Sequence, residues 1–183
     1  GLLGYVYCND GSVSTKTITI TDTFAVGNIK GNAAVGSLVG KTYANYSYNH
    51  VNIVNSYGIG KVEGSSNLGG LIGINHGDLV VTNSYWTPES TNQYWSSGGI
   101  RNALTNMQYE TGYVSWDFEN VWSIGDGEKG TIAYLKNLPI PSSVYMENID
   151  EFEFAGGDGT EANPYIIMTP EQLAAVNYNV DLY

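Results

Sequence analysis

Residues 69–85 read GGLIGINHGDLVVTNSY, and most features of this stretch occur twice more upstream. When Phe24, Tyr57 and Tyr85 are aligned, the preceding positions form columns of like residues: Thr23/Ser56/Ser84, Asp22/Asn55/Asn83, Ile20/Ile53/Val81 and Ile18/Val51/Leu79. Further upstream, GLLG at 1–4 matches SLVG at 37–40 and GLIG at 70–73. The aromatic residue recurs after 57 − 24 = 33 and 85 − 57 = 28 residues. Periods of about 20 to 50 residues indicate a solenoid or a propeller.

Apolar columns, one short strand for each, with glycines at the corners predict an all-β fold built as a parallel β-solenoid. A single unit cannot bury its apolar face until neighbouring units stack on it. In residues 15–21, TKTITIT, the isoleucines are expected to point to one side and the threonines to the other. We expect the Asp22/Asn55/Asn83 column at a turn, with asparagine side chains hydrogen-bonding along the stack. An antiparallel sandwich has a similar local pattern, but the agreement of columns across three units favours the solenoid.

The pattern divides the chain into three predicted regions. Residues 1–93 are expected to form the solenoid coils. Residues 94–141 contain Trp95, Trp116 and Trp122, and they are expected to close the open end of the solenoid, with a short helical turn near 104–108. Residues 142–183 are expected to form a connector, a strand at 165–168 and a helix that opens a following module, because TPEQ at 169–172 is a capping box. Residue 1 falls inside a repeat, so we expect a fragment of a longer polypeptide.

Composition narrows the class of protein. Charged residues make up 14% and hydrophobic residues 42%, with 23 glycines, which disfavours both a disordered tract and a helical bundle. The formal net charge of −11 predicts no nucleic-acid partner, because such binding depends on basic residues. Cys8 is the single cysteine, which excludes an intramolecular disulfide framework. No run of 18 or more apolar residues occurs, so no membrane insertion is expected from residues 1–183. The sequence specifies no oligomeric state.

No metal or cofactor site is predicted. Metallopeptidase chemistry requires His-Glu-x-x-His on a helix, and neither His50 nor His76 begins that pattern. GDGE at 125–128 and GGDGTE at 156–161 fit neither the EF-hand loop nor the repeated calcium-binding nonapeptide, so plain turns are expected there.

Catalysis by paired carboxylates is the alternative from another functional class. A polysaccharide lyase or glycoside hydrolase built on a β-helix would need two carboxyl groups about 5 to 9.5 Å apart beside a cleft. The candidates are Asp22, Glu63, Asp78, Asp117, Glu119, Asp126 and Glu128. Asp22 shares a column with two asparagines, which indicates a turn, and the other carboxylates are expected to solubilise loops. We therefore predict that this chain is not an enzyme.

The repeats resemble the GLUG motif of bacterial surface proteins. The resemblance rests on GLIG at 70–73 with Asn75 and NSY at 83–85, and on NSYGIGKV at 55–62. Residues 84–135 and 156–173 are similar to sequence that commonly accompanies the motif. The first unit departs from it, with DTFA at 22–25 in place of Asn-Ser-Tyr. The resemblance implies a secreted or wall-attached protein of the adhesin type.

Aromatic residues among polar ones are the remaining candidates for ligand contact. Tyr43, Tyr46 and Tyr48 lie in a variable connection, and Trp86 and Trp95 lie among Ser, Thr, Asn and Gln. Such rings stack on sugars or anchor a protein partner when exposed, whereas Trp86 and Trp95 could instead pack over the solenoid end. We predict an extracellular, non-enzymatic module of a bacterial adhesin-like protein. It would act as a rigid spacer and as a display surface for a glycan or a host surface protein.

Overall fold

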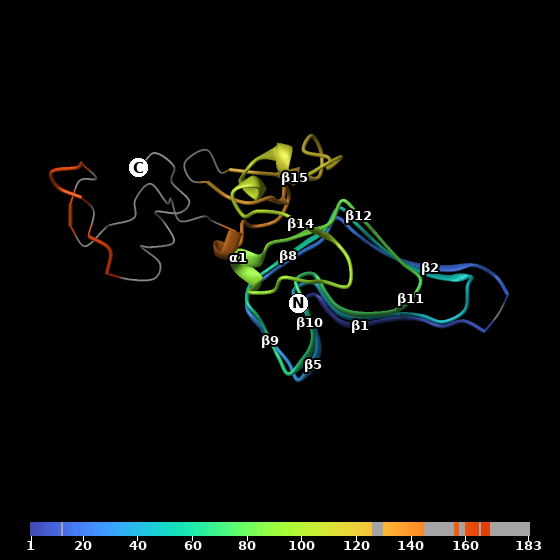
Figure 1. Ribbon diagram of the computed structural model, residues 1–183. Coiled ribbons are helices and arrows are strands. Elements are labelled where there is room, and N and C mark those ends of the chain that lie inside the picture. The colour runs from blue at the N-terminus through green and yellow to red at the C-terminus, as the bar shows by residue number, and fades with distance from the viewer. Residues whose placement is uncertain (12, 126–129, 145–155, 158–159, 165, 169–183) are drawn as a thin grey trace.

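The computed structural model describes residues 1–11, 13–125, 130–144, 156–157, 160–164 and 166–168 (Figure 1). Most of its regular structure is short β-strands, so the chain is all-β. Residues 1–36, 37–69 and 70–86 form three successive units, called here the first, second and third unit. The first contains β1 (Leu3–Cys8), β2 (Lys16–Thr21), β3 (Phe24–Val26), β4 (Ile29–Lys30) and β5 (Ala33–Gly36).

The second and third units follow the same plan. The second contains β6 (Val39–Ala44), β7 (Asn49–Val54), β8 (Tyr57–Ile59), β9 (Val62–Glu63) and β10 (Ser66–Gly69). The third contains β11 (Ile72–Gly77), β12 (Leu79–Thr82) and β13 (Tyr85–Trp86). The elements after them are α1 (Pro88–Thr91), β14 (Ile100–Arg101), the 3-10 helices η1 (Asn106–Gln108), η2 (Glu110–Gly112) and η3 (Ser142–Val144), and the antiparallel pair β15 (Trp122–Ser123) and β16 (Tyr134–Leu135).

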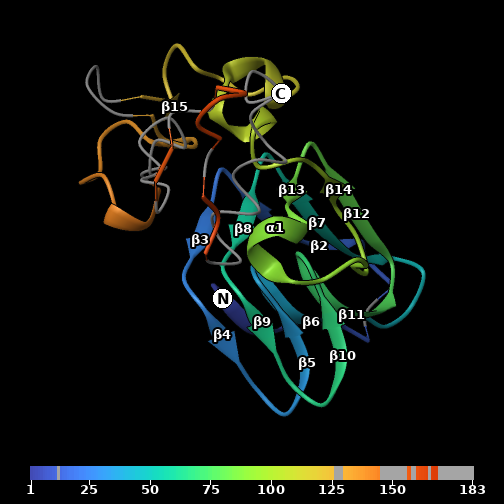
Figure 2. The same cartoon turned by 60° about the vertical axis from the view of Figure 1, so that its left-hand side comes forward.

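Strands of neighbouring units pair in parallel, position by position (Figure 2). The sheets are β1-β6-β11, β2-β7-β12, β3-β8-β13-β14, β4-β9 and β5-β10. Ile18 faces Val51, which faces Leu79, and Phe24 faces Tyr57, which faces Tyr85. These partners are the columns read from the sequence, so the predicted register is confirmed.

The β1-β6-β11 and β2-β7-β12 sheets lie face to face and form a wing that extends away from the other strands (Figure 1). Their inward side chains and three residues outside these strands, Leu38, Leu71 and Trp86, form one hydrophobic core. The strand residues in it are Val6, Cys8, Ile20, Val39, Ala44, Val51, Ile53 and Ile72. The threonines of β2 point outward, as the alternation predicts. Fully burying one Val, Leu or Ile side chain stabilises the folded state by about 1.5 to 3 kcal/mol. Because these side chains are buried only when units stack, the stability of the core depends on neighbouring units.

The corner after the β2-β7-β12 sheet explains the Asp22/Asn55/Asn83 column. The φ angles of these residues are 48°, 46° and 45°, in the left-handed region that Asn and Asp tolerate best. The expected asparagine hydrogen bonds along the stack are not what holds this corner, because the next column supplies them instead. The backbone N–H of Thr23 donates to the Ser56 hydroxyl at 3.3 Å, and the N–H of Ser56 donates to the Ser84 hydroxyl at 3.1 Å.

The glycine column Gly4/Gly40/Gly73 marks a close approach of backbones. A Cβ on Gly40 would lie 2.5 Å from the carbonyl oxygen of Ala34 and 2.6 Å from that of Gly4. A Cβ on Gly4 meets nothing within 4 Å. A Cβ on Gly73 would lie 2.5 Å from the carbonyl oxygen of Gly40, so packing requires glycine at positions 40 and 73 but not at position 4.

The predicted closing segment divides into two parts. Residues 95–102 lie on the third unit, where the N–H of Gly70 donates to the Trp95 carbonyl at 2.8 Å and the N–H of Leu71 donates to the Ser96 hydroxyl at 3.1 Å. Residues 103–125 and 130–144, called here the lateral segment, instead pack against the side of the β3-β8-β13 sheet. With the column of Phe24, Tyr57 and Tyr85, they form a second hydrophobic core. Its buried residues are Tyr57, Ile59, Tyr85, Met107, Tyr113, Trp116, Trp122, Ile132, Ala133, Tyr134 and Val144.

Polar atoms of aromatic residues fix this lateral segment in place. The Tyr57 hydroxyl donates to the Ala133 carbonyl at 2.6 Å, and the Trp116 indole donates to the Asn83 carbonyl at 2.7 Å. Burial raises the pKa of Tyr57 well above its usual value, so the phenol remains a neutral donor. Beyond this segment, residues 166–168 of the predicted strand form neither strand nor helix, and the predicted helix from 171 lies outside the described residues.

Replacing Gly40 by alanine tests the close approach. We expect Gly40→Ala to reduce the free energy of unfolding by about 3 kcal/mol or more, because its Cβ meets two backbone oxygens that belong to sheet contacts. Gly4→Ala is the matched control in the same column, with an expected change within about 0.5 kcal/mol. Urea unfolding measures both, and equal destabilisation of the two variants would contradict the packing.

Replacing Asn55 tests the left-handed corner. Asn55→Val is expected to cost about 1 to 2 kcal/mol of stability, because a β-branched residue is strained at positive φ, whereas Asn55→Gly is expected to be tolerated. Asn52→Val is the control, since Asn52 pairs with Val80 in a strand of ordinary geometry. Thermal unfolding followed by circular dichroism ranks the three variants. A stable Asn55→Val protein would rule out the left-handed conformation at this position.

Candidate functional site

The outer side of the wing carries a group of tyrosines around one lysine. Along β1 and β6, alternate residues point outward, which places Tyr5 and Tyr7 beside Lys41 and Tyr43. We call these four residues the tyrosine face. The Tyr7 and Tyr43 rings stack with centroids 5.2 Å apart, and the Lys41 ammonium lies 5.1 Å from the Tyr5 ring centroid. Tyr5 and Tyr7 are 49% and 50% exposed.

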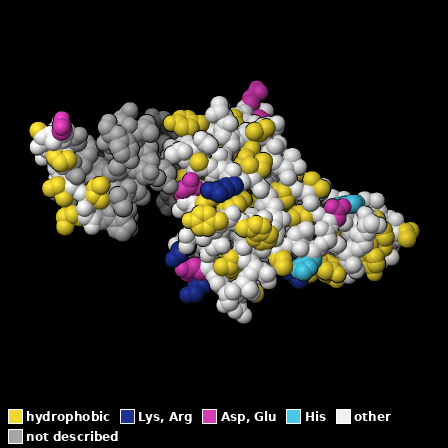
Figure 3. All heavy atoms as spheres, in the orientation of Figure 1, with side chains coloured by type: hydrophobic (Ala, Val, Ile, Leu, Met, Phe, Trp, Pro, Cys, Tyr) yellow, Lys and Arg dark blue, Asp and Glu magenta, His cyan; other side chains and the backbone are white. Residues whose placement is uncertain are grey.

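A second aromatic group lies at the tip of the wing, in the connection between β6 and β7. The Tyr46 and Tyr48 rings stack at 5.3 Å with an interplanar angle of 4°. Tyr46 is held at a φ of 68°, which turns the chain sharply. We call this the tip pair. Hydrophobic side chains gather at this end of the molecule, on the right of Figure 3.

Amide groups link the tyrosine face to the tip. The Asn9 side-chain amide donates to the Tyr7 hydroxyl at 2.5 Å, and the Asn45 amide donates to the Asn9 side-chain oxygen at 3.3 Å. Partial desolvation and then the neighbouring Tyr7 and Tyr43 phenols raise the pKa of Tyr5, which keeps its hydroxyl protonated. The surface therefore combines ring carbons with neutral donors and acceptors, the combination that suits a sugar or a polar protein surface.

The structure separates the five residues that the sequence singled out. Tyr43, Tyr46 and Tyr48 lie on the wing, with Tyr43 and Tyr48 half-buried and Tyr46 exposed. Trp95 is 58% exposed and lies on the third unit. Trp86 is not a surface residue: it is 3% exposed, because its indole fills the space above Gly70, where a Cβ would lie 1.9 Å from the ring.

Sequence reasoning missed Tyr5, Tyr7 and Lys41 as parts of this surface. They lie in the first strand of a unit, directly after the glycine pattern that aligns the units. The strict alternation of Tyr5 and Tyr7 with the buried Val6 and Cys8 was the available signal. The repeat aligns Tyr5 with Lys41 and Tyr7 with Tyr43, so all four side chains are expected on one face of the sheet.

Four of the candidate carboxylates have separate local partners. Asp22 accepts from the Trp122 indole at 3.3 Å, Glu63 lies 2.7 Å from the Lys61 ammonium, and Asp78 lies 2.6 Å from the His50 ring. The Lys61 hydrogen bond lowers the pKa of Glu63, and the backbone N–H of Asn120 lowers that of Asp117. A general acid needs a raised pKa, so Glu63 and Asp117 are perturbed in the wrong direction for that role.

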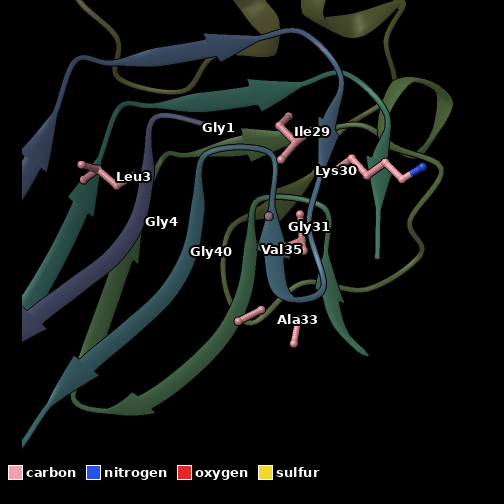
Figure 4. Close-up of a pocket in the computed structure, with 11 residues that line it drawn as sticks. Gly1, Leu3, Gly4, Ile29, Lys30, Gly31, Ala33, Val35 and Gly40 are labelled. Carbon is pink, nitrogen blue, oxygen red and sulfur yellow. The ribbon is translucent and has the colours of Figure 1, made fainter. Parts of the chain in front are cut away.

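A shallow pocket of about 220 Å³ lies at the first unit, lined mainly by backbone and by small or aliphatic residues such as Gly4, Ala33 and Val35 (Figure 4). Lys30 is its one titratable side chain, and its ammonium points away from the pocket. Among the described residues, His, Cys, Asp and Glu nowhere form a group of three or more that could hold a metal ion. Glu119 is exposed, and Asp126 and Glu128 lie outside the described residues.

Comparison with known proteins gives no match: no family model, no curated protein and no solved structure is similar to this chain. Within the part of the chain that the structure describes, no helix has the length and apolar character needed to cross a membrane.

The tryptophans provide a test of which candidate residues reach solvent. Trp95 is 58% exposed, whereas Trp86, Trp116 and Trp122 are at most 7% exposed. We expect acrylamide to quench one accessible class of tryptophan fluorescence, and Trp95→Phe to remove that class. Trp86→Phe is the control and should leave it in place. An accessible class that disappears with Trp86→Phe instead would contradict the burial of Trp86.

Proposed function

We propose that this chain is a non-enzymatic extracellular repeat module of a bacterial adhesin-like surface protein. In this proposal the three units are coils of a parallel β-solenoid of the GLUG type, which serves as a rigid spacer and as a display surface for a glycan or a host surface protein. The observation that carries the proposal is the in-register pairing of neighbouring units, which continues through five separate sheets. Such stacking suits an elongated, repetitive scaffold in which each unit contacts only its neighbours.

The tip connections support the display role. Strand positions are constant between units, but the connection across the tip shortens from residues 9–15 to residues 45–48 and then to Asp78 alone. Loops of different length on a constant frame are the usual carriers of recognition, because the scaffold fixes their position while their sequence varies. The tip pair lies in one of these connections.

The arrangement of charged groups favours binding over catalysis. Asp22, Glu63 and Asp78 stand at a corner, on β9 and at the tip, and each contacts a different donor or cation. A carbohydrate-active enzyme needs two carboxyl groups converging on one bond. A binding module needs only exposed rings and amides, which the wing has.

Binding of purified full chain to a glycan and mucin array tests the proposal. Tyr46→Ala/Tyr48→Ala is expected to weaken binding about tenfold or more, equal to about 1.4 kcal/mol, because both stacking rings are removed. Tyr94→Ala/Tyr109→Ala is the matched control, since these tyrosines are 79% and 63% exposed and lie outside the wing.

Circular dichroism establishes that each double variant remains folded. Equal loss in both variants would exclude the tip pair as the binding site. Absence of binding to every glycan, mucin and host surface protein tested would contradict the display role and leave a spacer. Release of reducing ends or unsaturated sugars from an acidic polysaccharide would favour the enzyme alternative.

A further inference from the structure

We propose that the tyrosine face binds the carboxylate-bearing sugar of an acidic glycan, with Lys41 as the cation that the carboxylate meets. This inference rests on the proposed glycan-binding function and specifies its ligand class. It uses a different part of the wing from the tip pair, on the outer surface of β1 and β6.

Lys41 is held in a fixed position among aromatic rings. It lies in the middle of β6, between β1 and β11, and its ammonium is 5.1 Å from the Tyr5 ring centroid and 5.9 Å from that of Tyr43. The side chain is half-buried, so its methylene stem packs along the sheet while the charged end stays accessible. Aromatic faces stabilise the cation without neutralising its charge.

The wing's other lysine and one of its two histidines are already paired. The Lys16 ammonium lies 3.6 Å from Asp10, and the His50 ring lies 2.6 Å from Asp78. These are the wing's two carboxylates, and the described part of the chain contains no ion pair for Lys41. Lys41 is therefore the lysine of the wing that is left to attract an external anion, and His76 lies on the neighbouring strand β11, beside Tyr43.

The net negative charge of the chain is not carried by the three units, so it does not oppose an anionic ligand there. The chain carries a formal net charge of −11, which would repel anions if it were spread evenly. Residues 1–86 contain four acidic and four basic residues, whereas residues 87–183 contain fourteen acidic and three basic residues. The formal charge of the three units is thus zero, and the whole excess of negative charge belongs to the rest of the chain.

The chemistry of the face favours a single sugar carboxylate over a polyanion. Binding of nucleic acid or a densely sulfated polymer requires several cations in a row, and the tyrosine face contains only Lys41. Tyr5 and Tyr7 provide half-exposed rings for the apolar side of a sugar, and the Asn9 amide beside the Tyr7 hydroxyl provides hydrogen-bonding groups for sugar hydroxyls. One ion pair together with these contacts matches a uronic-acid or similar residue.

The experiment compares two probes that differ only in the carboxylate. A glucuronate-terminated trisaccharide and its glucose-terminated counterpart are titrated into the full chain, and saturation-transfer NMR records binding. We expect the acidic probe to bind about tenfold more tightly or better at low salt, with this preference falling as salt is added. Lys41→Met, which keeps an unbranched apolar stem, should abolish the preference. Lys30→Met removes a cation elsewhere in the units and should preserve it.

The outcomes separate this inference from the proposed function. Equal binding of the two probes, or a preference unchanged by Lys41→Met in a folded variant, overturns the inference while leaving glycan display intact. If Lys30→Met loses the preference for the acidic probe as fully as Lys41→Met does, the preference comes from general charge attraction, and the inference about Lys41 is overturned. If neither probe binds but the array detects another ligand, the inference fails and the proposed function stands. If no ligand binds in either experiment, both recognition claims fail.

Discussion

Hydrogen bonds between neighbouring units are the interaction on which the fold depends. Strands β1 to β12 pair with strands of an adjacent unit, and in the described residues none of them pairs within its own unit. An isolated unit would therefore expose both its backbone polar groups and its apolar side chains. The glycine at position 40, the left-handed residue at position 55 and the stacked aromatic column all serve one requirement, which is to keep successive backbones in register.

The same constraint creates the surface that we propose for recognition. In-register stacking repeats outward positions as well as inward ones, so Tyr7 and Tyr43 are brought to adjacent strands and Lys41 is placed beside Tyr5. The lateral segment of residues 103–125 and 130–144 covers the column of Phe24, Tyr57 and Tyr85, and thereby buries Tyr57 and Tyr85 and part of Phe24. Aromatic residues on the outer side of the β1-β6-β11 sheet therefore remain partly exposed, whereas Tyr57 and Tyr85 of the β3-β8-β13-β14 sheet are buried.

The sequence predicted the parts of the fold that repeat. Two columns matched the observed strand partners: Ile18/Val51/Leu79 and Phe24/Tyr57/Tyr85. They were predictable because each unit places the same kind of side chain in the same environment. Features without a repeat were not predictable in this way. The Trp122 indole reaches Asp22 across 100 residues of sequence, and the burial of Trp86 depends on Gly70, in the bend between β10 and β11. Of the two readings that the sequence left open for Trp86, ligand contact and packing, the structure favours packing.

The most direct test of the stacked arrangement is backbone NMR of the full chain with measurement of contacts between protons of different strands. Parallel in-register stacking predicts interstrand contacts between Ile18 and Val51 and between Val51 and Leu79. Contacts that join β1 to β2 as an antiparallel hairpin, with no contacts at the spacing of one unit, would contradict it and indicate a sandwich instead.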